Sequence, residues 1–403
     1  MLRFLSGKNI VVLGLQPWDI EIGSNCKNIA LELSRSNRVL YVNRALDRLS
    51  LLKFRNHPRI KNRLDSIRGH KPDLEKVNEN LWSFNPRTIV ESFTRIPFKP
   101  VFEYFNLINN KRIAKEIERA CGVLGFERPV IFVDNDFFRA SRMKSLIQNE
   151  LFIYYIRDYL VNQRHFKPHG SRMEQELISK ADIVATNSVY LQKYAAPFNS
   201  RSYFIGQGFD AELFENSDNL INPSDLKNIP GPVIGYVGFI TVSRLDQQLI
   251  YEIAKSRPEW SIVLVGPEDE YFVKSSLHDM DNVFFLGHKD KKELPAYIKH
   301  FDVCLNPQLK NEQTEGNYPL KIDEYLSLGK PVVATRTEAM EMFSNHTYLA
   351  TGLDEYILKI ELALSEKDKY VHERTDFAKA HTWAQCIQNL DDVIHSLSNQ
   401  KAV

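Results

Sequence analysis

Short apolar runs alternate with longer amphipathic stretches along this chain, and that alternation most constrains its fold. In the first half, the runs rich in Val, Ile, Phe and Tyr are 9–15, 38–43, 81–85, 129–134, 151–156, 182–187 and 202–206. They are nearly continuous in hydrophobicity, which indicates strands covered on both faces, as in parallel sheets. Segments with helical spacing lie between them. We therefore predict a doubly wound α/β sheet.

A second series of the same kind follows a polar segment. Residues 215–230 are rich in Asn, Asp and Pro and have no periodicity, which predicts an interdomain linker. Further strands are expected at 232–238, 261–267, 282–287, 302–307 and 331–335. After about residue 352 the pattern is helical. At 403 residues the chain is longer than one core usually covers, so we predict domains at 1–214 and 231–381.

Composition excludes several classes of protein. The formal net charge is only +1, whereas a nucleic-acid-binding protein usually carries a basic excess. The four cysteines are scattered without a CxxC pair, which argues against a zinc site or disulfide framework and fits a reducing compartment. The N-terminus is predicted to be a buried strand and not a signal peptide, and no apolar run reaches the roughly 20 residues of a membrane span. We expect a cytoplasmic protein, soluble or peripheral.

The segment 314–335, TEGNYPLKIDEYLSLGKPVVAT, is the most informative part of the second series. It predicts a helix with Pro319 in its first turn and Gly329 at its C-terminal end. Lys321 then lies in the first turn, where a cation opposes the helix dipole unless an anion binds there. Glu324 lies one turn along the same side. A phosphate on Lys321 and sugar hydroxyls on Glu324 would form a nucleotide site; a surface Lys–Glu pair fits the spacing equally well.

Two further strand ends carry candidate ligand groups. In GYVGFITVSRLD, Gly235 and Gly238 bracket the end of a strand and would let backbone approach a ligand. Arg244 follows, predicted at the start of the next helix, where it could fork onto a diphosphate. In FFLGHKDKKEL a strand ends at Gly287 before His288, and the backbone of this loop is predicted to contact a nucleobase.

These segments together resemble the retaining glycosyltransferases of the GT-B type, close to glycosyltransferase family 4 and its bacterial polysaccharide branch. The similar stretches are YFIGQGFDAELF, GPVIGYVGFITVSRLDQQLIYEIAKSRPEWSIVLVGP and YPLKIDEYLSLGKPVVAT, in the family's order. The resemblance implies two Rossmann-like domains facing across a cleft, the first for the acceptor and the second for a nucleotide-sugar. It also implies that a helix at about 382–403 packs back on the first domain.

The resemblance also implies roles for individual residues. Arg244, Lys321 and Asp158 would be catalytic, the first two on the diphosphate and the third on the acceptor hydroxyl. The residues expected to bind the donor are Gly238, Gly287, His288, Glu315, Tyr318, Leu320 and Glu324. One departure concerns Glu315: eight residues separate it from Glu324, where the family often has seven. Either the loop bulges so that Glu315 reaches the sugar, or Lys321 and backbone groups replace it.

In the first domain the resemblance places a loop for the acceptor and diphosphate at Gly14, Gly23 and Ser24. Asp158 alternatively caps a loop. The sequence VDND, residues 133–136, matches the metal motif of a different glycosyltransferase class, but its position in the first of two Rossmann-like halves argues against a metal there. We predict no metal and no cofactor, since the nucleotide-sugar is a substrate.

The function implied is transfer of a sugar, with retention, to a growing glycan or lipid-linked acceptor in cell-surface polysaccharide synthesis. A non-catalytic nucleotide-sugar-binding subunit and a related two-Rossmann epimerase are the alternatives. Residues 48–71 contain eight Lys/Arg residues and one acidic residue, interleaved with apolar side chains. This stretch predicts contact with an anionic membrane surface, although a solvated loop or a wall for an anionic acceptor is also consistent with it.

Overall fold

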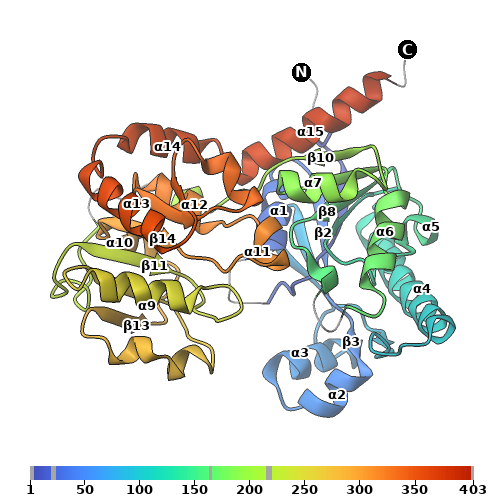
Figure 1. Ribbon diagram of the computed structural model, residues 1–403. Coiled ribbons are helices and arrows are strands. Elements are labelled where there is room, and N and C mark those ends of the chain that lie inside the picture. The colour runs from blue at the N-terminus through green and yellow to red at the C-terminus, as the bar shows by residue number, and fades with distance from the viewer. Residues whose placement is uncertain (1–3, 20–23, 163–165, 215–219, 401–403) are drawn as a thin grey trace. The chain divides into compact units, whose positions relative to one another are not determined.

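The computed structural model describes residues 4–19, 24–162, 166–214 and 220–400. The chain divides into two compact units (Figure 1). Unit 1 comprises residues 1–206 and 386–403, and unit 2 comprises residues 207–385. Each unit is an α/β sheet with helices, as the alternating pattern predicts.

Unit 1 is built on an eight-stranded sheet in the order β10-β9-β8-β7-β1-β2-β5-β4. Its strands are β1 (Asn9–Leu13), β2 (Arg38–Val42), β4 (Leu74–Asn78), β5 (Leu81–Phe84), β7 (Val130–Asp134), β8 (Leu151–Ile156), β9 (Ile183–Thr186) and β10 (Ser202–Phe204). Neighbouring strands are parallel except β4, which runs antiparallel to β5. All the strands predicted for this half are confirmed. The edge strand β4 was not predicted, because its exposed polar sequence LEKVN lacks an apolar run.

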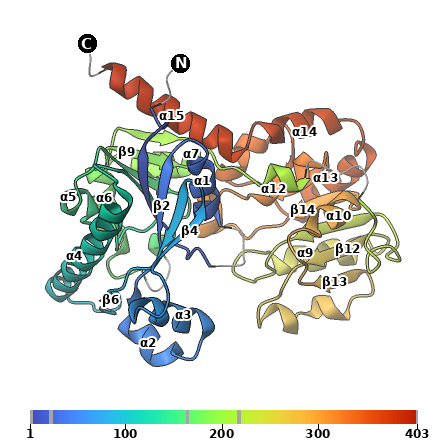
Figure 2. The ribbon, with the colours of Figure 1, turned by 180° about the vertical axis from the view of Figure 1, so that it is seen from behind.

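Helices pack beside this sheet, and a small subdomain extends from it (Figures 1 and 2). The helices are α1 (Asn25–Ser34), α4 (Lys99–Leu124), α5 (Met143–Leu146), α6 (Gly170–Lys180), α7 (Val189–Ala195) and α15 (Trp383–Gln400), with a 3-10 turn at Leu160–Asn162. The subdomain consists of β3 (Leu46–Asp47), α2 (Arg48–Phe54), α3 (Pro58–Ile67) and β6 (Ile89–Val90). We call it the insert.

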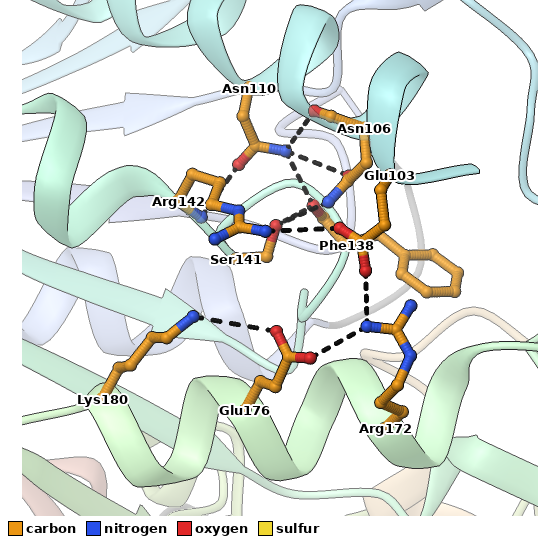
Figure 3. Close-up of polar contacts among 9 residues, drawn as sticks. All are labelled: Glu103, Asn106, Asn110, Phe138, Ser141, Arg142, Arg172, Glu176 and Lys180. Atoms are coloured by element: carbon orange, nitrogen blue, oxygen red, sulfur yellow. Dashed lines mark hydrogen bonds and ion pairs between the residues drawn. The ribbon is translucent and has the colours of Figure 1, made fainter. Parts of the chain in front are cut away.

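A polar network joins the helices on one side of unit 1 (Figure 3). Glu103 of α4 forms ion pairs with Arg142, just before α5, and with Arg172 of α6. Asn106 donates to Ser141 Oγ at 2.8 Å, and Arg172 also pairs with Glu176 on its own helix. The charges of these arginines are therefore satisfied within the unit, and they hold the helices together.

Unit 2 contains a parallel six-stranded sheet in the order β13-β12-β11-β14-β15-β16. The strands are β11 (Val233–Val237), β12 (Ser261–Val265), β13 (Val283–Gly287), β14 (Val303–Asn306), β15 (Val332–Thr335) and β16 (Tyr348–Ala350). Its helices are α8 (Ala211–Phe214), α9 (Gln247–Ser256), α10 (Leu294–Lys299), α11 (Glu312–Gly316), α12 (Lys321–Ser327), α13 (Leu353–Ser365) and α14 (Val371–Lys379), with 3-10 turns at Phe272–Lys274, Ser276–Asp279 and Glu338–Phe343.

Alternate residues of the second sheet enter different cores. On β11, Val233 and Val237 pack into one cluster, whereas Ile234 and Tyr236 pack into another. Since side chains alternate across a strand, both faces of this sheet are covered, which explains its continuous apolar runs. The predicted strands are confirmed; the short β16 was not predicted.

The units divide earlier than the predicted domain boundary at residue 214. Phe209 pairs with Thr382 in an isolated bridge, and a Cβ on Gly208 would lie 2.2 Å from the backbone nitrogen of Trp383, so this segment belongs to unit 2. Part of the predicted linker also packs there, since Leu226 is buried in the core of unit 2. The burial of Leu226 was not predicted, because the residues around it in 220–230 are mostly polar or proline. Residues 215–219 lie outside the described residues.

The C-terminal part of α15 belongs to unit 1. Asp391 accepts a hydrogen bond from the backbone nitrogen of Leu5, and Asn389 donates to the carbonyl of Ile205 at 3.1 Å. Leu390 and Ile394 are buried, in agreement with the helical spacing of the apolar residues there. The C-terminal part of α15 therefore contacts unit 1 near the beginning of the chain, at Leu5, and near residue 206, at Ile205.

Replacing Leu390 by alanine is expected to destabilise the protein by about 2 to 5 kcal/mol, because the side chain is fully buried and leaves a cavity. Denaturant unfolding of Leu390→Ala measures this. Ser396→Ala, at an exposed position of the same helix, is the control and should unfold like the wild type. Equal midpoints for the two variants would contradict the packing of this helix.

Candidate functional site

Two glycines bring backbone close together at the carboxyl ends of β11 and β12. Gly238 has φ +143° and Gly266 has φ +147°, conformations that side-chain-bearing residues rarely adopt. A Cβ on Gly266 would lie 1.9 Å from the carbonyl oxygen of Gly238. This edge of a parallel sheet is where α/β proteins bind ligands, and the glycines keep it free of side chains.

Lys321 lies against the same strand end. It is the first residue of α12, and its Nζ donates a hydrogen bond to the Tyr236 hydroxyl at 2.6 Å. The ammonium group also lies 4.0 Å from the centroid of the Tyr236 ring. A Cβ on Gly238 would be 3.1 Å from Nζ. Burial lowers the pKa of Lys321 to about 7, with Arg244 adding to the effect and Glu324 opposing it.

Glu324 lies on α12 one turn after Lys321. Burial raises the pKa of its half-buried carboxyl to about 7; Lys291 and Lys321 oppose this rise, and Asp323 and Asp210 add to it. The part of the chain that the structure describes places no hydrogen-bond donor or ion pair on this carboxylate. The site thus contains a cation and a carboxyl group that both titrate near neutrality, and the carboxyl has acceptor capacity left for ligand hydroxyls.

Arg244 is exposed on the turn between β11 and α9. The prediction that it begins the helix was wrong, because Asp246 caps α9 by accepting from the backbone nitrogen of Leu249 at 3.0 Å. Leu309 donates to the Arg244 carbonyl at 2.8 Å, which fixes the turn. The guanidinium acts on the pKa of Lys321, so both cations belong to one region of unit 2.

Pro319 precedes α12 and does not lie in its first turn, because Leu320 is the N-cap residue. Gly329 follows the helix with φ +72°, as predicted. The Tyr318 hydroxyl donates to Asp323 at 2.6 Å, and the other oxygen of Asp323 forms a hydrogen bond with His381 Nδ1 at 2.7 Å. The Tyr318 hydroxyl therefore secures the loop before α12, and the buried Tyr318 ring packs against Phe343 in the core of unit 2, with ring centroids 5.4 Å apart.

The remaining donor candidates lie on neighbouring loops of unit 2. Glu315 is on α11, and its Oε1 accepts from the backbone nitrogen of Glu338 at 3.1 Å. Gly287 has φ +67°, and its carbonyl accepts from the nitrogen of Gly266 at 2.9 Å. His288 is exposed. The 287–288 loop is therefore held next to the glycine-rich ends of β11 and β12.

In unit 1, Gly14 follows β1 in close contact with Tyr41. A Cβ on Gly14 would lie 2.3 Å from the Tyr41 hydroxyl, and its carbonyl accepts from Arg139 at 2.7 Å. Ser24 is the N-cap residue before α1 and is buried, and among the described residues its Oγ has no hydrogen-bond partner. Gly23, the third residue predicted for this loop, lies outside the described residues.

Asp158 belongs to a charged cluster at the carboxyl ends of β7 and β8. Arg157, almost completely buried, donates from Nε to Asp134 at 2.8 Å and from Nη1 to Asp158. Asn135 accepts from the backbone nitrogens of both Arg157 and Asp158, at 2.7 and 2.9 Å. Asp158 keeps 26% of its side chain exposed, so it is held in place yet accessible.

The two aspartates of VDND face different arginines. Asp134 pairs with Arg157, whereas Asp136 pairs with Arg139. Within the described residues no group of three or more His, Cys, Asp or Glu side chains is arranged to hold a metal ion. The nearby sequence HFKPHG contributes His169 to the core, where it stacks on Phe102 with centroids 3.8 Å apart.

Several residues of these sites were missed in the sequence. Tyr236 holds Lys321, and its only signal is an aromatic residue within the GYVG run. Lys291 pairs with Asp210 at 2.8 Å, and both act on Glu324 from segments distant in sequence. Asp134 positions Asp158 through Arg157, which pairs with both aspartates. This contact requires β7 and β8 to be adjacent, and no spacing within the sequence predicts it.

Among the comparisons with known proteins, the match to a protein family model falls within the second unit. Residues 231–363 match the family model for glycosyl transferases group 1. A curated relative, the putative teichuronic acid biosynthesis glycosyltransferase TuaH of Bacillus subtilis, is 28% identical over 224 residues. That match covers 52% of this chain and 56% of the relative, so it spans only about half the length of either protein.

Solved structures resemble the whole chain. Sucrose-phosphate synthase from Thermosynechococcus elongatus has a TM-score of 0.68 at 15% identity, covering 98% of this chain and 100% of that one. Anabaena HepE, in a complex with UDP, has a TM-score of 0.63 at 16% identity, covering 97% and 100%. The trehalose-6-phosphate protein of E. coli bound with UDP-2-fluoro glucose has a TM-score of 0.68 at 12% identity, covering 96% and 98%.

The chain therefore has the two-domain Rossmann-like fold of the GT-B glycosyltransferases. In its second unit, the range that matches the model for glycosyl transferases group 1 is 231–363, and Gly238, Lys321 and Glu324 lie within this range. The GT-B prediction is confirmed, whereas assignment to family 4 stays a prediction.

Proposed function

We propose that this protein transfers a sugar, with retained anomeric configuration, from a nucleotide-sugar held by unit 2. The observation that carries this proposal is the position of Lys321 and Glu324 one turn apart on α12, with Lys321 held on Tyr236 at the glycine-lined end of β11. The match of this unit to glycosyl transferases group 1 supports it. So do structural neighbours that were solved in complex with UDP and with UDP-glucose.

In this proposal the cations act on the leaving group. Lys321 and Arg244 contact the diphosphate and stabilise the negative charge that develops as the glycosidic bond breaks. Glu324 accepts hydrogen bonds from the ribose hydroxyls. The backbone at Gly238 and at the 287–288 loop approaches the nucleotide closely, and Glu315 and Leu320 lie on the loops expected around the donor. No protein nucleophile, metal ion or cofactor is required.

Unit 1 supplies the acceptor side of the reaction. Asp158 orients the attacking hydroxyl, and Arg157 with Asp134 positions that carboxylate. Before α1, the buried Ser24 hydroxyl is available to a polar ligand. The acceptor we propose is a growing glycan or lipid-linked saccharide in cell-surface polysaccharide synthesis, which is supported by the relative named for teichuronic acid biosynthesis.

A panel of nucleotide-sugars tests this function. Release of nucleoside diphosphate, by transfer to a saccharide acceptor or by slow hydrolysis, is the expected result. An isomerised nucleotide-sugar would instead identify an epimerase, and tight binding without turnover a non-catalytic subunit. Analysis of the anomeric configuration of the product by NMR separately tests retention.

Donor binding should also change the protonation of the site. The protein should take up a proton on binding above neutral pH and release one below it. At about pH 8 Lys321 is mostly neutral, so binding a diphosphate takes up a proton; at about pH 6 Glu324 is mostly protonated, so binding ribose releases one. Calorimetry in buffers of different ionisation enthalpy measures this exchange. Lys321→Arg should abolish the uptake and Glu324→Gln the release. An exchange that both variants retain would contradict the assignment of these two groups.

A further inference from the structure

The insert is fixed at its base. Strands β3 and β6 pair with each other, and Asp47 caps α2 by accepting from the backbone nitrogen of Ser50 at 3.0 Å. From α3, Arg63 reaches back to Asp19 at 3.1 Å and to the carbonyl of Arg44 at 2.8 Å. The base of the insert is thus tied to the sheet unit, while α2 and α3 extend away from it (Figures 1 and 2).

The apolar side chains of α2 are exposed to an extent that is unusual for a surface helix. Leu49, Leu52 and Phe54 are 40%, 80% and 58% exposed, and no residue of α2 is buried. By contrast, Ile60, Leu64 and Ile67 of α3 are half-buried. The sequence predicts a membrane-contacting stretch over 48–71. The structure narrows its apolar part to Leu49, Leu52 and Phe54 of α2, the exposed large apolar side chains of this stretch.

Arg48, the first residue of α2, pairs with Glu91, but five other exposed cations near these side chains have no ion pair with a described residue. These five lie along α2, the following turn and α3: Lys53, Arg55, Arg59, Lys61 and Arg68. Elsewhere in unit 1 many arginines are paired, as Arg142 and Arg172 are with Glu103. The insert therefore presents uncompensated positive charge beside exposed apolar surface.

Charge and apolar surface meet in a groove between α2 and α3. The groove has a volume of about 620 Å³ and is lined by Leu51, Leu52, Leu64, Arg55, Lys61 and Arg68, among others. Asp65 is the acidic residue in its wall. Leucine side chains next to guanidinium and ammonium groups match the boundary between acyl chains and phosphate groups of a lipid layer.

We propose that the insert docks this protein on an anionic lipid bilayer. Leu52 and Phe54 enter the interface between headgroups and acyl chains, and the cations of α2 and α3 face the lipid phosphates. The apolar side chains favour a bilayer over a nucleic acid, which would need only the charge. This inference does not depend on the proposed glycosyl transfer. In the described residues, no helix is long and apolar enough to cross a membrane.

Sedimentation of the full chain with vesicles tests the docking. One vesicle preparation contains phosphatidylglycerol in phosphatidylcholine, the other phosphatidylcholine alone. We expect binding to the anionic vesicles at low salt and its loss at high salt, because salt screens exposed charge. Arg55→Glu/Lys61→Glu should lower the partition coefficient at least about tenfold. Leu52→Ser/Phe54→Ser should lower it by a similar factor.

The matched control is Lys111→Glu/Lys115→Glu, which changes the net charge equally at exposed positions of α4. It should bind vesicles like the wild type, and unchanged thermal melting of all variants verifies their fold. No binding to either vesicle, equal and salt-insensitive binding to both, or full binding by the insert variants would overturn the proposal. Binding to single-stranded RNA without binding to vesicles would likewise overturn it.

Discussion

Replacing Lys321 by alanine should lower kcat by roughly 100- to 1000-fold, the loss typical when one preorganised group that stabilises developing charge is removed. The donor KM should change less, because the diphosphate carries more negative charge as it departs than in the bound substrate. Arg244→Ala should act in the same direction with a smaller effect, since this side chain is exposed and more of its field is screened. Steady-state rates of nucleoside diphosphate release measure both.

Lys292→Ala is the matched control for Lys321, because Lys292 is an exposed lysine of the same unit on a different loop. It should retain the wild-type rate. Lys321→Arg distinguishes charge from geometry: partial activity is expected, since a guanidinium keeps the charge but fits the Tyr236 contact differently. Near wild-type kinetics in Lys321→Ala would remove this residue from the reaction.

Replacing Glu324 by alanine should raise the donor KM and lower turnover, so that kcat/KM falls by roughly 10- to 100-fold. This is the range expected for the loss of hydrogen bonds to a charged group. Since binding the ribose requires the ionised carboxylate, Glu324→Gln should recover little activity. A donor analogue that lacks the ribose 2′-hydroxyl should be bound less tightly by the wild type.

The measurement for Glu324 is a pair of donor-saturation curves, one for the ribonucleotide donor and one for its 2′-deoxy analogue. The difference between the two donors should largely disappear in Glu324→Ala, because the group that senses the hydroxyl is gone. The control variant Glu270→Gln, at an exposed position of the same unit, should keep the wild-type difference between the two donors. A preference for the ribonucleotide that persists in Glu324→Ala would place the ribose contact elsewhere.

Much of the fold could be predicted because parallel strands covered on both faces must be continuously apolar. That requirement reveals segments such as 151–156 and 261–265 directly in the sequence. It fails for β4, an exposed antiparallel edge strand whose side chains are polar. The unit boundary was misplaced for a related reason: the anchoring of 207–214 depends on contacts with residues near 382, far along the chain.

The candidate site was predictable where its chemistry is local. Lys321 and Glu324 lie three residues apart on one helix, so their shared side follows from helix geometry. The neighbours that set their pKa values, among them Arg244 and Lys291, come from separate loops, and helix spacing carries no information about them. Asp134 shows the same limit, since its partner Arg157 lies at the end of the next strand of the sheet, 23 residues further along the chain.

Calorimetric titration with nucleoside diphosphates tests most directly the claim that unit 2 holds the donor on Lys321 and Glu324. The wild type is titrated with UDP, GDP, ADP, CDP and TDP, and compared with Lys321→Ala/Glu324→Gln and with the control Lys292→Ala/Glu270→Gln. We predict that the wild type and the control bind at least one of these ligands with the same affinity, and that the Lys321/Glu324 variant binds it at least about tenfold more weakly. Equal binding by all three proteins, or binding of none of the ligands by the wild type, would contradict the claim.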